Sequence, residues 1–175
     1  MNAADSDRLT LRVPGLADFE DSAAMWSDRG VVRHITGRTF TREESWARLM
    51  RYVGHWQLFG FGFWVVRERG GGRFVGEVGL ANFRREMQPP LDGGFEIGWA
   101  IAPSAQGKGY ATEAALASLR WIEQRHAPPR TVCIINPENA PSIGVARKCG
   151  YSEFGRTTYK DSPVILLERP AQQVS

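Results

Sequence analysis

The residues that most clearly suggest chemistry form the short stretch QGKGYA, from Gln106 to Ala111. Two glycines flank Lys108 directly before an alanine-rich run with the composition of a helix. A helix that begins here exposes backbone N–H groups without partners and carries about half a positive charge at its first turn. Because glycine has no side chain, an anion can approach the backbone closely at Gly107 and Gly109. The stretch therefore indicates a site for a phosphate group.

Two well-known phosphate loops do not match this stretch. The nucleotide P-loop, G-x-x-x-x-G-K-[ST], needs Ser or Thr after its lysine, whereas Gly109 follows Lys108. The dinucleotide fingerprint, G-x-G-x-x-G, needs a third glycine at the position of Thr112. On spacing alone, two interpretations stay open: an anion cradle of another kind, and a strand-to-helix turn that uses glycine for its geometry.

Two carboxylates lie in apolar segments that have the composition of strands. Glu96 lies in GFEIGWAI and Glu77 in VGEVGL. A buried carboxylate is costly unless it is paired or used. Glu96 is therefore the first candidate for a general base and Glu77 the second, and for each the alternative is an ion pair or an outward orientation.

Composition and charge narrow the class of protein. The chain has 175 residues, a length that fits one domain over 1–175. The formal net charge is +3 and acidic residues interleave with the arginines, so we expect no nucleic-acid partner. Cys133 and Cys149 form no C-x-x-C pair and no cluster with the histidines, so we expect no metal and two small buried hydrophobic thiols.

The same features indicate a cytoplasmic protein without a membrane partner. The N-terminal segment MNAADSDRLTLRV has no apolar core of the kind that a signal peptide needs. No apolar run approaches the roughly 20 residues of a membrane span. Two unpaired thiols fit a reducing compartment.

Changes in hydrophobic period predict the elements that position these residues. Thr41 and Glu44 resemble a capping box that begins a helix, and Gly150 resembles a glycine that ends one. This order of elements predicts a mixed α/β sheet in one domain. Strands are predicted over 8–13, 61–69, 73–83, 95–103 and 131–136 and in two runs within 151–169, with helices over 16–28, from 41 past 56, over 110–125 and within 137–150. Core positions are expected for Trp26, Trp46, Trp56 and Trp64, whereas Trp99 is expected near the site.

The glycine-rich loop is one of four segments that together resemble a known family. QGKGYATEA is similar to the acyl-CoA pyrophosphate loop, Q/R-x-x-G-x-G/A, of the GNAT N-acetyltransferase superfamily. DRLTLR and FEIGWAI resemble the opening and central strands of its RimJ/RimL-like branch, the ribosomal-protein N-terminal acetyltransferases. The segments come in family order and cover about 8–169. The fourth, NPENAPSIGVARKCGY, resembles N-x-x-S…K-x-G-F, with Asn139, Ser142, Lys148, Gly150 and Tyr151 at its positions.

The resemblance implies a fold and a cosubstrate. The fold is an α/β GNAT fold with about six to seven strands, about four flanking helices and splayed central strands at 95–101 and 131–136. The cosubstrate is acetyl-CoA, whose pyrophosphate the loop amides would hold and whose carbonyl oxygen would face the N–H groups of 99–101. The residues that the resemblance assigns to acetyl-CoA are Trp99, Ala100, Ile101, Gln106, Gly107, Lys108, Gly109, Tyr110, Ala111, Thr112, Asn139 and Ser142.

The implied reaction transfers the acetyl group to a primary amine of a protein N-terminus or a small molecule, by direct attack in a ternary complex. The amine must be neutral to attack, so a base such as Glu96 is needed. Many relatives carry a tyrosine as general acid at the position of Ala146, which cannot donate a proton. Ser142 or water is the alternative donor, and His34 lies in a loop that borders the acceptor site in the family.

The missing tyrosine keeps a second function open, a non-catalytic acyl-CoA-binding regulatory domain of the same fold. The chain is expected to act as a monomer or a homodimer.

Overall fold

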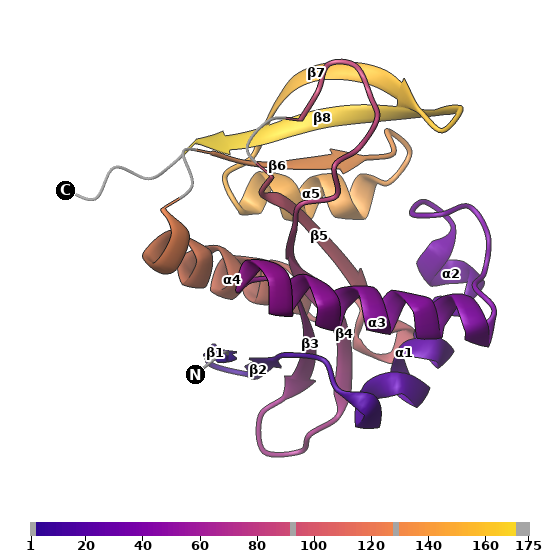
Figure 1. The fold of residues 1–175 in the computed structure, drawn as a ribbon, viewed down its shortest axis with the longest axis vertical. Coiled ribbons are helices and arrows are strands. Elements are labelled where there is room, and N and C mark those ends of the chain that lie inside the picture. The colour runs from indigo at the N-terminus through magenta and orange to yellow at the C-terminus, as the bar shows by residue number, and fades with distance from the viewer. Residues whose placement is uncertain (1–2, 92–93, 128–129, 171–175) are drawn as a thin grey trace.

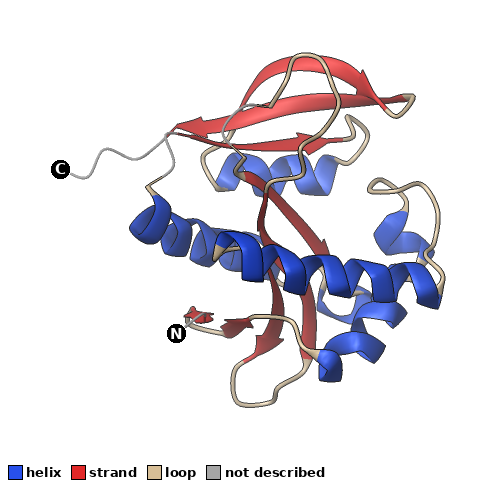
Figure 2. Ribbon diagram, viewed as in Figure 1, coloured by secondary structure: helices blue, strands red, loops and turns tan. Residues whose placement is uncertain are grey.

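The computed structural model describes residues 3–91, 94–127 and 130–170, which form one mixed sheet covered by helices (Figures 1 and 2). The strand order is β1-β2-β3-β4-β5-β6-β8-β7, and β5 runs parallel to β6. The strands are β1 (Ala3–Asp5), β2 (Leu9–Arg12), β3 (Phe63–Glu68), β4 (Phe74–Ala81), β5 (Glu96–Ile101), β6 (Arg130–Ile135), β7 (Ser152–Tyr159) and β8 (Ser162–Pro170). The α-helices are α1 (Phe19–Trp26), α2 (Arg29–Val32), α3 (Arg42–Phe59), α4 (Tyr110–His126) and α5 (Ala140–Lys148), and Leu16–Asp18 and Pro103–Ala105 form short 3-10 turns.

The described residues form eight strands and five α-helices, more than the six to seven strands and four helices expected. The additions include β1 with three residues and α2 with four. Elements this short leave no periodic pattern in a sequence. A local cap supports α2, because the Asp28 side chain accepts a hydrogen bond from the Val31 N–H at 3.0 Å.

Helices cover both faces of the sheet. α4 and α5 lie over β4, β5 and β6 on one face, whereas α1 and α3 lie on the other (Figure 1). α3 begins at the predicted capping box: Thr41 Oγ accepts from the Glu44 N–H at 3.2 Å, and the Glu44 carboxylate accepts from the Thr41 N–H at 2.9 Å. The ring of Tyr52 from α3 stacks on Phe63 of β3 at 4.8 Å.

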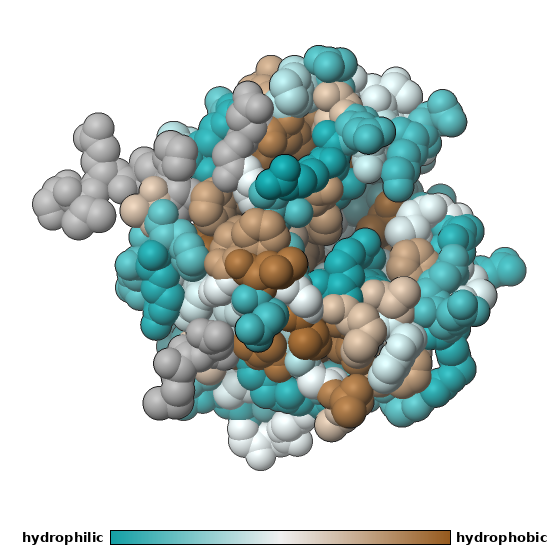
Figure 3. All heavy atoms as spheres, viewed as in Figure 1, coloured by the Kyte–Doolittle hydropathy of each residue, from teal (hydrophilic) through white to brown (hydrophobic). Residues whose placement is uncertain are grey.

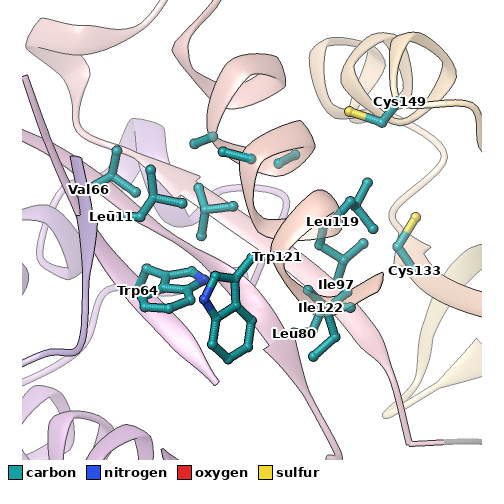
Figure 4. Packing of buried hydrophobic residues seen from close by; sticks show 14 of the residues in the cluster. Leu11, Trp64, Val66, Leu80, Ile97, Leu119, Trp121, Ile122, Cys133 and Cys149 are labelled. Carbon is teal, nitrogen blue, oxygen red and sulfur yellow. The ribbon is translucent and has the colours of Figure 1, made fainter. Parts of the chain in front are cut away.

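The largest hydrophobic core lies between the sheet and α4 (Figure 4). Trp64 and Trp121 meet edge to face at 5.1 Å within it. Cys133 and Cys149 are buried there, and burial raises the pKa of both thiols, that of Cys149 to about 11. The expectation of two buried hydrophobic thiols is confirmed.

The expectation that Trp46 lies in the core is wrong, because it lies on the outer surface of α3. Trp46 is 43% exposed rather than in the core, and its ring contacts Phe19 edge-on at 5.3 Å. Met50 and Val53 are also exposed, and Figure 3, which looks onto α3, shows hydrophobic residues on this face. Apolar residues surround more than half of this helix, so their period alone does not determine which stripe faces the sheet.

The central strands separate directly after they meet. β5 and β6 pair at one position, Glu96 with Val132, where the Val132 N–H donates to the Phe95 carbonyl at 3.0 Å. Beyond that position β5 continues beside β4, and β6 continues beside β8 (Figure 1). The predicted splay of 95–101 from 131–136 is confirmed.

Candidate active site

The glycine-rich loop ends in a helix start that no side chain caps. Gly107 and Gly109 have φ values of 76° and 77°, in the left-handed region that favours glycine. Gly109 is the N-cap of α4, and the first backbone bond of the helix runs from the Glu113 N–H to the Gly109 carbonyl at 3.1 Å. The N–H groups of residues 110–112 precede that bond, so they are available to an anion.

Arg8 holds this loop from a distant part of the chain. Its guanidinium donates to the Lys108 carbonyl at 3.0 Å and to the Glu113 carboxylate at 2.7 Å. The same guanidinium lies 4.7 Å from the centroid of the Tyr110 ring. Sequence reasoning missed this role, because Arg8 and Lys108 lie 100 residues apart and no local pattern links them.

A groove of about 720 Å³ lies beside the start of α4. Arg8 and Lys148 bring positive charge to its wall, Asp7 and Glu113 bring negative charge, and Gly109 and Thr112 bring the helix start. Lys108 directs its ammonium to the Ser104 carbonyl at 2.9 Å. Cations, open N–H groups and glycine backbone fit the diphosphate that the resemblance implies.

The edge of β5 that faces the gap has no strand partner beyond Glu96 within the described residues. The Ala102 N–H donates to Val75 of the β4 segment at 2.9 Å. Because hydrogen-bonding direction alternates along a strand, Ala100 also faces β4, where it pairs with Glu77. The backbone groups of Ile97, Trp99 and Ile101 therefore face the gap. Of the three expected oxyanion donors, 99 and 101 have this direction and 100 does not.

Trp99 and Ser142 meet across the gap. The indole Nε1 of Trp99 donates to Ser142 Oγ at 3.1 Å. Asn139 caps α5, since its side-chain carbonyl accepts from the Ser142 N–H at 3.2 Å, and its amide group can still donate. The position of the expected family tyrosine, Ala146, is buried in the core.

Glu96 lies where the central strands separate, and Arg85 binds it. Arg85 Nε and Nη2 donate to the two Glu96 oxygens at 2.7 and 2.6 Å. Burial raises the pKa of Glu96, and the Arg85 guanidinium opposes this effect. A carboxylate has about four acceptor sites, so this pair leaves sites for a proton on both oxygens.

The hydrogen bonds of Glu77, the second candidate base, indicate a structural role. It is 1% exposed and accepts hydrogen bonds from Ser22, from Trp26 Nε1 at 2.9 Å and from the Tyr52 hydroxyl at 2.9 Å. These donors come from α1 and α3, so the carboxylate ties both helices to the sheet. His34 lies half-buried in the turn after α2.

Within residues 3–91, 94–127 and 130–170, no helix combines the length and apolar character needed to cross a bilayer. The same residues contain no group of three His, Cys, Asp or Glu side chains placed to ligate a metal ion.

A mixed sheet with separated central strands, beside a helix start with open N–H groups, defines an α/β protein with a candidate anion site. The comparisons make this assignment specific: residues 8–152 match the acetyltransferase (GNAT) domain model. The chain belongs to the GNAT acetyltransferase family.

Several similar proteins agree with this assignment. A Bordetella pertussis structure assigned to the GnaT family of acetyltransferases shares 30% identity and a TM-score of 0.85, over 97% of this chain and 99% of that one. The Bacillus subtilis N-acetyltransferase YnaD, itself uncharacterized, is 28% identical over 85% of this chain and 81% of its own. The uncharacterized YkkB of the same organism is 31% identical over 63% of this chain, and the match spans 62% of YkkB.

Ribosomal-protein acetyltransferases are also among the similar structures, and one of them, RimL, is in complex with coenzyme A. Their identity to this chain is 15–19%, a level that shows the shared fold alone. Membership of the RimJ/RimL-like branch therefore stays a prediction.

Proposed function

We propose that this protein transfers an acetyl group from acetyl-CoA to a primary amine. The separation of β5 from β6 next to the uncapped start of α4 carries this proposal. The loop can bind a diphosphate, and the free edge of β5 can bind an extended amide chain as an added strand. Acetyl-CoA combines these two chemical parts.

The chain's own groups supply what binding requires. Gly107 and Gly109 bring the backbone close to the diphosphate, and the N–H groups of 110–112 donate to it. The Ile101 N–H and the Trp99 carbonyl offer strand-edge hydrogen bonds to pantetheine amides, and the amide group of Asn139 offers another.

The same groups account for the reaction. The neutral amine attacks the thioester carbonyl carbon, and the N–H of Trp99 stabilises the developing oxyanion. Glu96 accepts the proton that the amine loses, directly or through a water. The C–S bond then breaks, and the Ser142 hydroxyl, held by Trp99, donates a hydrogen bond to the departing thiolate. The acceptor in this proposal is a protein N-terminus or a small-molecule amine.

A second function is favoured by one observation. Arg85 occupies both oxygens of Glu96, and residue 146 is alanine, so the base is restrained and the usual acid is missing. A regulatory domain that binds acyl-CoA without turnover would have these features.

Two measurements test both functions. At a hundredfold excess over its dissociation constant, acetyl-CoA should stabilise the fold by about 2.7 kcal/mol, measured as a rise in melting temperature. Thiol release with a panel of primary amines should then report turnover. Stabilisation without turnover of any amine would favour the regulatory domain, and no stabilisation would refute both functions.

A further inference from the structure

Two arginines from separate elements border one patch of aromatic rings on the sheet face that α3 covers. Arg85 follows β4 and pairs with Glu96 at the start of β5. Arg51 projects from α3, and its guanidinium lies 6.0 Å from the centroid of the Tyr52 ring. Tyr52 stacks on Phe63, whose ring lies so close to β5 that a Cβ added at Gly98 would be 3.0 Å from it.

A second set of contacts places Arg85 beside the same aromatic rings. Its guanidinium lies 4.5 Å from the centroid of Phe83, and Phe83 lies 6.0 Å from Phe63. Both cations therefore border one patch of rings beside residues 96–98. This patch adjoins the point where the central strands separate, where the amine would meet the thioester.

The charges at this patch do not balance. Arg85 is paired with Glu96, and Arg48 lies 3.7 Å from Glu77. Arg51 is exposed, and within the described chain no carboxylate lies within 4.0 Å of it. The protein around the guanidinium of Arg51 removes part of its hydration, and the guanidinium groups of Arg48 and Arg85 lie nearby. Both effects, the first being larger, hold the pKa of Arg51 below its usual value. The guanidinium of Arg51 is therefore available to pair with an anionic group of a ligand.

We propose that Arg51, together with Arg85, selects acceptors whose primary amine is accompanied by a carboxylate. This inference rests on the proposed acetyl transfer and names its substrate class. Guanidinium groups bind carboxylates through short, charge-assisted and often bidentate hydrogen bonds. A carboxylate on the acceptor would also compete with Glu96 for Arg85, and so would release the proposed base when a correct acceptor is bound.

Matched peptides provide the test, because they share one N-terminal amine. The first pair is the tripeptide amides Ala-Glu-Ala and Ala-Gln-Ala, which differ by one side-chain carboxylate. The second pair is free alanine and alaninamide, which differ by the α-carboxylate of the amino acid itself. We expect kcat/KM to be at least tenfold higher for the carboxylate member of one pair or both, and the pair that responds identifies a peptide or a free amino acid as the source of the carboxylate. We also expect this preference to shrink in added salt.

Arg51→Met keeps the aliphatic stem and removes the charge. We expect it to reduce the preference to less than threefold while the rate with the neutral peptide stays unchanged. Arg125→Met, on α4 and so on the opposite face of the sheet, is the control and should keep the full preference, and melting curves should show that both variants fold.

The outcomes separate the two proposals. Turnover of both members of each pair at equal rates, or a full preference in Arg51→Met, would overturn the inference and leave acetyl transfer intact. No turnover of any amine would overturn both.

Discussion

The indole Nε1 of Trp99 donates a hydrogen bond to Ser142 Oγ at 3.1 Å, and this contact joins β5 to α5 across the gap between the central strands. Because Ser142 Oγ accepts, its own O–H is free to donate to a departing thiolate. We expect Ser142→Ala to lower kcat about 10- to 100-fold, which is the worth of one hydrogen bond to a charged group.

Trp99 is expected to act through Ser142, so a double-mutant cycle measures their coupling. Trp99→Phe should lower kcat by a smaller factor, and in the Ser142→Ala background it should cost nothing further. Thiol release at saturating acetyl-CoA is the measurement. Losses that multiply in the double variant would contradict this role.

Gly109→Val should abolish acetyl-CoA binding and leave the fold intact. Its φ of 77° is strained for a β-branched residue by about 1–2 kcal/mol, and relaxation of the loop would move the N–H groups that hold the diphosphate. Gly72→Val is the matched control, since Gly72 has a φ of 66° in the β3–β4 turn with open space around it. Calorimetry should find binding lost in the first variant and kept in the second.

Arg8→Met should raise the KM for acetyl-CoA several-fold with little change in kcat, because it removes the bond to the Lys108 carbonyl and leaves the reacting groups in place. Arg69→Met is the control. Arg69 follows β3 and donates to the carbonyl of Ser6 at 2.9 Å; Ser6 lies in the same β1–β2 turn as Arg8, but Arg69 has no described bond to the glycine loop. Equal changes in KM in both variants would show that the turn as a whole, rather than Arg8, positions the loop.

Glu96→Gln should lower turnover about 10²- to 10⁴-fold at neutral pH if Glu96 is the base. In the wild type, kcat/KM should fall as pH drops through the pKa of Glu96, which burial raises. In the variant, this fall should move up to the pKa of the amine itself, about 8 for an α-amine.

Glu77→Gln serves as the comparison for Glu96. It should keep the wild-type pH profile but lose about 3–5 kcal/mol of stability in urea unfolding, because three buried donors lose their charged acceptor. A Glu96→Gln rate within threefold of wild type would remove Glu96 as the base.

His55 predicts a loss of stability at mildly acidic pH. Its Nδ1–H donates to the Phe61 carbonyl at 2.7 Å and its Nε2 accepts from the Asn82 N–H at 2.9 Å, which requires the neutral ring. Burial lowers the pKa of His55, so between that value and about 6.5 the unfolded chain binds the additional proton. The contribution is present above about pH 6.5 and is lost as pH falls.

Urea unfolding at pH 5 and pH 7.5 measures this effect. His55→Gln should flatten the difference between the two pH values. His34→Gln removes a ring in the turn after α2 and should leave the difference as in the wild type.

Local features of the sequence were sufficient for much of this structure. The capping box at Thr41, the glycine turn at 106–111 and the apolar strand at 95–101 each depend on residues near one another in the chain, so the local sequence predicts them. The order of these elements was enough to predict the mixed sheet, whereas the separated central strands were implied by the resemblance of four segments to the GNAT family.

Tertiary structure alone decided which charges meet. Glu96 is paired with Arg85 because the loop after β4 returns to the start of β5, and no periodicity describes that loop. Arg8 reaches Lys108 across 100 residues because β2 and the start of α4 lie together in the fold. Arg51 has no carboxylate partner among the described residues, and the sequence of α3 does not predict this, because apolar residues surround more than half of the helix and only packing against the sheet determines what each side chain meets.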